Sequence, residues 1–179
     1  MSQVIELEKA KLNVAAKRGY RNWTSAFDEK FTVDTKLSDI STATLSYLAQ
    51  AQDKSTFYLY DLIMSLEGLG SGFEFHELAG DKKMAVIDRY LFILDRIRFE
   101  CMKRLGWLDS YPGEDLSLVE MIARFEDVAP ALHARIPVLS KTHPGYERYS
   151  SLNSFDQETF IRKLIPKALK QIQDYSTTL

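Results

Sequence analysis

The sequence is poor in cysteine, the residue that cross-links many small secreted proteins. Cys101 is the only cysteine in 179 residues, so no disulfide can form within one chain. A zinc cage built from several cysteines of one chain is excluded for the same reason. A single thiol is typical of proteins from a reducing compartment, and we expect a cytoplasmic location. A chain of this length can bury a core without such cross-links.

Long apolar runs are also missing. The longest, from Tyr90 to Leu94, is far shorter than the roughly 20 residues that cross a bilayer. Near the start of the chain, Glu6, Lys9 and Arg18 interrupt the apolar residues, which argues against a signal peptide. We therefore expect a soluble protein that does not use the membrane as a partner.

The chain has no excess of charge of one sign. Its 23 basic and 25 acidic residues give a formal net charge of −2. Such a balance produces no long-range field that would attract a polyanion or an anionic lipid surface. We therefore expect no binding to nucleic acid.

Strand patterns and repeats are scarce, whereas helical spacing is common. Only residues 31–33 and 73–75 alternate as strands do, and neither segment has an evident pairing partner. We predict an all-α fold with one domain over residues 1–179, a bundle of about six or seven helices with a long central helix near 81–105. The expected helices lie near residues 3–18, 21–31, 39–51, 55–67, 81–105, 118–129 and 155–175.

Several helix ends are marked by single residues. Ser117 and Glu120 have the spacing of a capping box, which predicts a helix that begins at Leu118. Pro130 is expected to end that helix, because proline cannot donate a backbone hydrogen bond. Gly106 is expected to stop the long central helix in a left-handed conformation.

The stretch Gly68, Gly70 and Gly72 invites comparison with phosphate-binding loops. A dinucleotide fingerprint needs a third glycine where Phe73 stands, and a P-loop needs a Gly-Lys-Ser/Thr ending that is not present. We interpret the stretch as a joint between two helices, which could act as a hinge.

Glu74, His76 and Glu77 are weak candidates for metal ligands that follow the glycine stretch. His133 and His143 could complete a site if folding brought them close. The Glu-x-x-His pattern of di-iron helical bundles does not occur in this sequence. We therefore expect no metal and no other cofactor.

Two charges lie in apolar surroundings. Asp61 is the only charged residue between Phe57 and Leu66 on a nearly uniformly apolar helix, and Arg98 falls within an apolar arc of the central helix. We expect Asp61 and Arg98 to meet as a structural ion pair. The alternative is a pocket in which both hold an anionic ligand with Tyr58 or Tyr60. The arc consists of Ile87, Leu91, Leu94, Cys101 and Leu105.

The central helix carries further charges that we expect to face solvent. Asp88 and Asp95 share one face, and we favour a solvated edge over a pair of catalytic carboxylates. A stripe of mixed charge is also expected to lie in solvent. It consists of Lys82, Arg89, Arg96, Glu100 and Lys103.

Aromatic and basic residues gather in a less regular segment towards the C-terminus. They are His143, Tyr146, Arg148 and Tyr149. One interpretation is a recognition loop. The other is a connection whose tyrosines fix it to the end of the bundle.

Patterns that indicate catalysis are missing. Cys101 has no histidine near it in sequence, and no G-x-S-x-G elbow occurs. We favour a non-enzymatic helical interaction or regulatory module that self-associates or docks on a larger protein partner. The alternative is a small-molecule-binding protein or enzyme whose pocket uses Arg98, Asp61 and a tyrosine.

Overall fold

The structure, a computed structural model, describes residues 2–177, so residues 1, 178 and 179 of the predicted domain lie outside it. The chain is largely helical, which confirms the predicted all-α class. Its α-helices are α1 (Ser2–Gly19), α2 (Arg21–Phe27), α3 (Thr42–Ala49), α4 (Asp53–Leu66), α5 (Gly80–Arg104), α6 (Leu118–Ala123), α7 (Phe125–His133), α8 (Tyr146–Ser150) and α9 (Ser154–Thr177). Two short 3-10 helices are η1 (Leu37–Asp39) and η2 (Gly72–Glu77).

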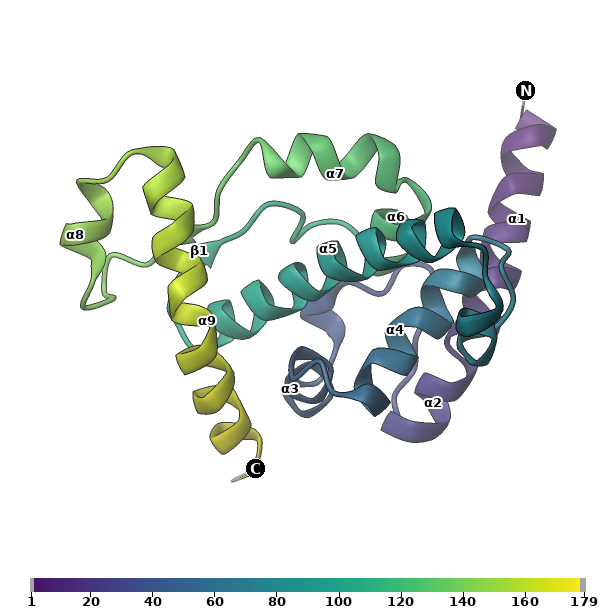
Figure 1. The fold of residues 1–179 in the computed structure, drawn as a ribbon, viewed down its shortest axis with the longest axis horizontal. Helices are drawn as coiled ribbons and strands as arrows, with labels where there is room; N and C mark the ends of the chain where they lie inside the picture. Colours follow the sequence, from purple (N-terminus) through teal and green to yellow (C-terminus); the bar gives the residue numbers. More distant parts are fainter. Residues whose placement is uncertain (1, 178–179) are drawn as a thin grey trace.

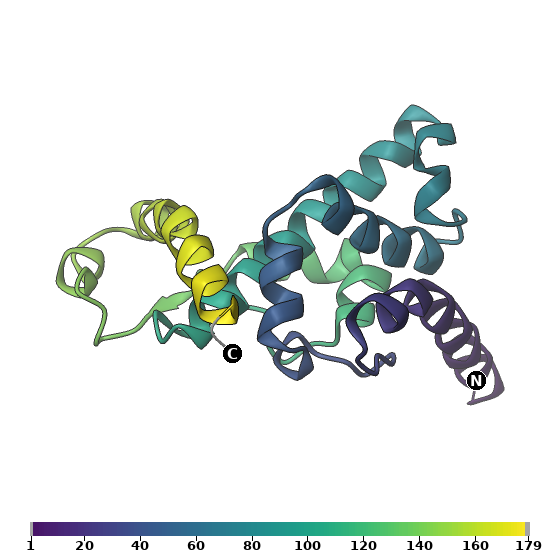
Figure 2. The same cartoon turned by 90° about the horizontal axis from the view of Figure 1, so that it is seen from below.

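The long helix α5 runs through the middle of the molecule, as predicted (Figure 1). At one end it is crossed by α9, and at the other end α4 packs beside it, with α1 packed in turn on α4. The N-terminal turns of α1 project away from the rest of the chain in both views (Figures 1 and 2). Within residues 2–177, every helix is too short or too polar to span a membrane.

Two very short strands form the sheet seen in the described part of the chain. β1 (Leu108–Ser110) pairs antiparallel with β2 (Val138–Leu139), and Leu108 lies opposite Leu139. Neither segment that alternates in sequence, 31–33 or 73–75, forms a strand, and residues 73–75 lie in η2. Strands of two and three residues are too short to show an alternating pattern, so no sequence pattern predicts them.

The core has two parts. The larger one draws on α1–α7 and on Ile172 of α9, and it includes Trp23, Leu59 and Ile97. The smaller one lies under the sheet and α9 and includes Phe99 and Ile161. Because α5 contributes to both, it is buried on most of its circumference.

Helix ends that depend on local residues lie where the sequence predicted them. Gly106 adopts a φ of 80°, and its N–H donates to the carbonyl of Lys103 while the N–H of Trp107 donates to that of Met102. This pair of bonds is a Schellman motif. Helix α6 begins at Leu118, and the N–H of Glu120 donates to Oγ of Ser117 at 3.0 Å.

The predicted helix over 118–129 is wrong in its interior and at its end. It breaks at Arg124, where φ is −109° and ψ is 29°, and α7 then continues to His133. Pro130 lies inside α7 instead of ending it. Its ring fixes φ at a helical value, and at an exposed position the loss of one backbone hydrogen bond is tolerated.

Candidate functional site

Asp61 of α4 is buried, and its hydrogen bonds connect α4 to α2 and η2. Its carboxylate accepts hydrogen bonds from Nδ2 of Asn22 in α2 and from the backbone N–H of Gly72 in η2, both at 2.9 Å. A buried carboxylate is tolerated when donors of this kind satisfy it. The contacts of Asp61 are therefore structural.

The predicted pair between Asp61 and Arg98 is not formed. Nε of Arg98 donates instead to the carbonyl of Ala49 at 3.1 Å, at the last residue of α3. The last carbonyls of a helix lack partners within it, and a cation there also complements the helix dipole. The expected arc was misplaced, because Leu91 within it is 52% exposed and Arg98 lies at its half-buried edge.

The two tyrosines of the predicted pocket face different neighbours. Tyr58 packs on Phe27, with ring centroids 4.9 Å apart, whereas Tyr60 stacks on Phe75 at 4.5 Å. Arg98 lines a cleft elsewhere, so the structure does not bring these side chains together in one pocket.

The cleft that contains Arg98 lies between α5, α7 and α9 and has a volume of about 490 Å³. Arg162 donates to both oxygens of Asp95, at 3.2 and 2.9 Å, and thereby ties α9 to α5. Asp88 is exposed, as expected for a solvated edge, but Asp95 is not. Acidic and basic groups alternate around this cleft, so neither sign of ligand charge is favoured.

The predicted glycine joint lies between α4 and α5. Gly68 and Gly70 adopt φ values of 69° and 95°, a conformation that glycine adopts without strain. A Cβ added to Gly72 would lie 2.9 Å from Cε2 of Phe57, so the backbone packs closely on α4 here. Movement about this joint stays a prediction.

The weak metal-ligand candidates Glu74, His76 and Glu77 are exposed in η2. His133 contacts the ring of Phe92, and His143 that of Trp107, in other parts of the fold. Within the described range, no group of three or more His, Cys, Asp or Glu side chains is placed to hold a metal ion.

The aromatic and basic segment around α8 is fixed mainly by Tyr149. Its side chain is buried, and its hydroxyl donates to the carbonyl of Pro137 at 3.0 Å. Nδ1 of His143 accepts from the N–H of Gly145, and burial together with the charge of Lys167 lowers the pKa of that imidazole. Tyr146 is half-buried beside Tyr149, with ring centroids 6.1 Å apart, and Arg148 is exposed.

Three charged residues of the central helix are buried, although the sequence predicted them in solvent. They are Arg89, Arg96 and Glu100. Arg96 lies between the rings of Phe92 and Phe99, each 5.0 Å from its guanidinium carbon, and donates to the carbonyl of Pro112 at 2.6 Å. Burial lowers the pKa of Arg96 to about 10, so it stays charged at neutral pH.

The other two buried charges also join distant elements. Glu100 accepts from the hydroxyl of Tyr111 at 2.7 Å and from Arg104 at 3.1 Å. Burial and the charge of Glu100 raise the pKa of Tyr111. Arg89 pairs with Glu67 at 3.0 Å, which links α5 to the end of α4. All three charges are therefore engaged in packing, not presented to a ligand.

Helix α1 carries exposed apolar side chains that the rest of the chain leaves uncovered. Among the described residues of α1, only Ala16 and Gly19 are buried. Four large apolar side chains are more than half exposed: Val4 (60%), Ile5 (54%), Leu7 (56%) and Val14 (58%). Exposed apolar side chains that gather on one element mark an interaction site more often than scattered ones do.

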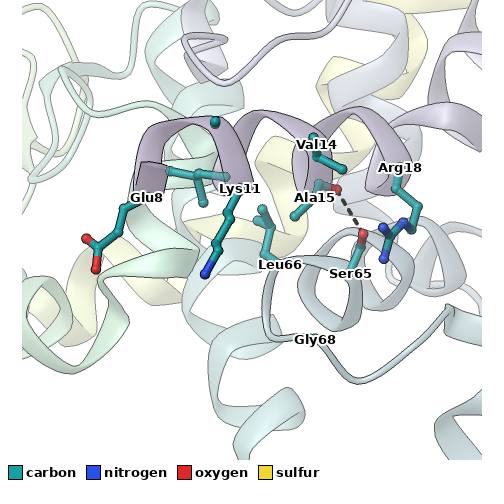
Figure 3. Close-up of a pocket in the computed structure, with 10 residues that line it drawn as sticks. Glu8, Lys11, Val14, Ala15, Arg18, Ser65, Leu66 and Gly68 are labelled. Atoms are coloured by element: carbon teal, nitrogen blue, oxygen red, sulfur yellow. Dashed lines mark hydrogen bonds between the residues drawn. The ribbon is translucent and has the colours of Figure 1, made fainter. Parts of the chain in front are cut away.

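A groove of about 560 Å³ adjoins this surface, between α1 and the end of α4 (Figure 3). The two helices are close at its base, because Ser65 donates to the carbonyl of Ala15 at 2.8 Å. Lys11 extends across the groove beside Leu66, and Gly68 forms its far wall (Figure 3). We call the exposed face of α1 together with this groove the α1 surface.

Comparisons with protein-family models, with curated proteins and with solved structures found no match. The α1 surface is therefore interpreted from its own geometry. The sequence predicted a helix near residues 3–18 but could not show which of its side chains stay uncovered, because apolar stripes usually face a core.

Proposed function

We propose that the protein is a non-enzymatic helical interaction module that self-associates through the α1 surface. The observation that supports this proposal most strongly is the set of four exposed apolar side chains on α1. Apolar side chains of this size gain free energy when a partner removes them from water.

The stability of the α1 helix itself favours the proposal. An isolated helix of this length is marginal in water, and helices in proteins owe most of their stability to packing of an apolar face. The first turns of α1 gain little packing from their own chain, since residues 2–11 are exposed. A second molecule on the α1 surface would supply that packing.

The polar groups of the interior also favour a non-enzymatic module. Asp61, Arg96 and Glu100 are engaged by partners that tie helices together. A reducing, cytoplasmic location is part of the same proposal, because Cys101 is the only thiol and is buried.

Light scattering coupled to size-exclusion chromatography tests self-association. The wild-type protein is expected to elute as a dimer that dissociates on dilution, and Leu7→Glu and Val14→Glu are expected to elute as monomers. Leu91→Glu is the matched control, because Leu91 is similarly exposed but lies on α5. A monomeric wild type, or a loss of dimer in the Leu91 variant alone, would contradict the proposal.

A further inference from the structure

The exposed face of α1 has the spacing of a helix-pairing seam. Val4, Leu7, Lys11 and Val14 follow one another at intervals of three, four and three residues. Positions at these intervals lie along one stripe of a helix and form the contact line of paired helices. Lys11 is the one charged position in this stripe, and Glu8 lies beside it, one turn after Val4.

We infer that the occupant of this seam is α1 of a second copy, packed antiparallel about a two-fold axis level with residue 9. Reversal about this level sets Val4 opposite Val14 of the partner subunit, and Leu7 opposite the aliphatic stem of Lys11 of the partner subunit. The ammonium of each Lys11 then lies beside Glu8 of the other chain. The seam is thus complementary to itself in both apolar contact and charge, as a two-fold interface requires.

Charge argues against the parallel arrangement of the same two helices. In parallel register each residue of the seam lies beside its own copy, so the two Lys11 ammonium groups would face one another. Like charges at such a position weaken the pairing and help to select the partner's orientation.

The shape of the molecule argues for the same direction. The body of the chain is attached at the C-terminal end of α1, while the N-terminal turns project (Figures 1 and 2). Antiparallel pairing sets the two bodies at opposite ends of the helix pair. Parallel pairing would set them side by side at the same end.

The groove beside α4 accommodates the end of the partner helix. In the antiparallel register the first turn of the partner lies opposite residues 13–16 of α1. This is where Ala15, Leu66 and Gly68 line the groove. The apolar residues at the start of one chain therefore meet the apolar part of a groove that Arg18 and Ser65 also line, which extends contact beyond the helix seam.

Charge reversal with mixing tests the register, an inference that rests on the proposed self-association. Glu8→Lys and Lys11→Glu are each expected to weaken the homodimer by about tenfold, because each change creates two like-charge contacts across the axis. An equimolar mixture of the two variants is expected to form mixed dimers with near wild-type affinity. Native mass spectrometry with one variant labelled with ¹⁵N distinguishes the mixed dimer from both homodimers.

The mixture also separates the contact between chains from effects within one helix. Glu8 and Lys11 are three residues apart, so each substitution also creates a like-charge pair inside its own helix. That pair persists in the mixed dimer, so a gain on mixing reports the contact between chains. If the wild type dimerises but mixing restores nothing, the antiparallel register is wrong while self-association stands. A monomeric wild type would overturn both.

Discussion

Asp61 and Glu100 each carry a carboxylate into the interior, and each accepts at least one hydrogen bond from outside its own helix. Asn22 and Gly72 donate to Asp61, and Tyr111 and Arg104 donate to Glu100. Because a buried charge without a partner is costly, these contacts fix how the helices dock.

The Asp61 contacts predict a large effect of truncation at this position. Asp61→Ala is expected to lower the free energy of unfolding by about 2 kcal/mol, because two half-buried donors lose their acceptor. Asp61→Asn keeps one acceptor oxygen and is expected to lose about 1 kcal/mol. Urea denaturation measures both. Asp88→Ala, an exposed aspartate in α5, is the control and is expected to change little.

We expect the folded protein to lose stability in acid when Glu29 becomes protonated. Burial tends to raise the pKa of this carboxyl, but hydrogen bonds from Thr44 and Ser41 and the charge of Arg104 lower it overall from the ordinary 4.5. The ionised form is therefore favoured more strongly in the folded state. The stabilisation that ionised Glu29 provides is present above pH 4.5, and it is lost as the pH falls through the lower pKa of Glu29 in the folded state.

Urea titrations at neutral and acid pH measure the Glu29 contribution. Glu29→Gln is expected to be less stable than the wild type at neutral pH and to converge with it in acid. A difference between the two proteins that does not change with pH would contradict this role.

We expect the thiol of Cys101 to react only when the chain unfolds. It is buried, and burial raises its pKa to about 12, so the native protein holds almost no accessible thiolate. Maleimide labelling is expected to be slow in buffer and to follow the unfolding transition in urea. Fast labelling under native conditions would contradict the packing of α5.

The misplaced apolar arc of α5 shows that the sequence did not predict which individual side chains of this helix are buried. The helix is buried on most of its circumference, so apolar and charged residues are both in the core. Spacing alone predicted Arg98 inside and Arg96 outside, but Arg96 lies between two phenylalanines and Arg98 lies at the edge. The difference arises from tertiary neighbours that are far away in sequence.

Among the elements, helix ends were predictable where a residue acts locally. Gly68 follows α4 as a left-handed residue, and its N–H donates to the carbonyl of Ser65 while that of Leu69 donates to Met64. The break at Arg124 and the sheet were not predictable, because both depend on packing between segments and not on a local motif.

A matched pair of substitutions tests whether the left-handed conformation of Gly68 determines the end of α4. Gly68→Ala is expected to cost about 1 kcal/mol of unfolding free energy, because alanine is strained at a φ of 69° although nothing lies within 4 Å of the new Cβ. Gly80→Ala has equal space without a positive φ and is expected to stabilise by about 0.5 kcal/mol. Equal effects in urea denaturation would show that backbone strain does not set this helix end.

For the whole molecule, the sequence predicted the all-α class but not which face stays uncovered. The spacing of Val4, Leu7 and Val14 resembles that of helices that pack inward, such as α4. Only the arrangement of the other helices leaves these side chains exposed. Exposure of an apolar stripe is a property of the complete fold, so no local pattern could reveal it.

Native mass spectrometry of the untagged protein, beside a denatured sample of the same preparation, tests self-association most directly. We predict a native species at twice the 20.6 kDa chain mass, with no additional mass that is lost on denaturation. Leu7→Glu in the same experiment is expected to give the mass of one chain. A wild-type protein that stays at the mass of one chain at high concentration would contradict the account.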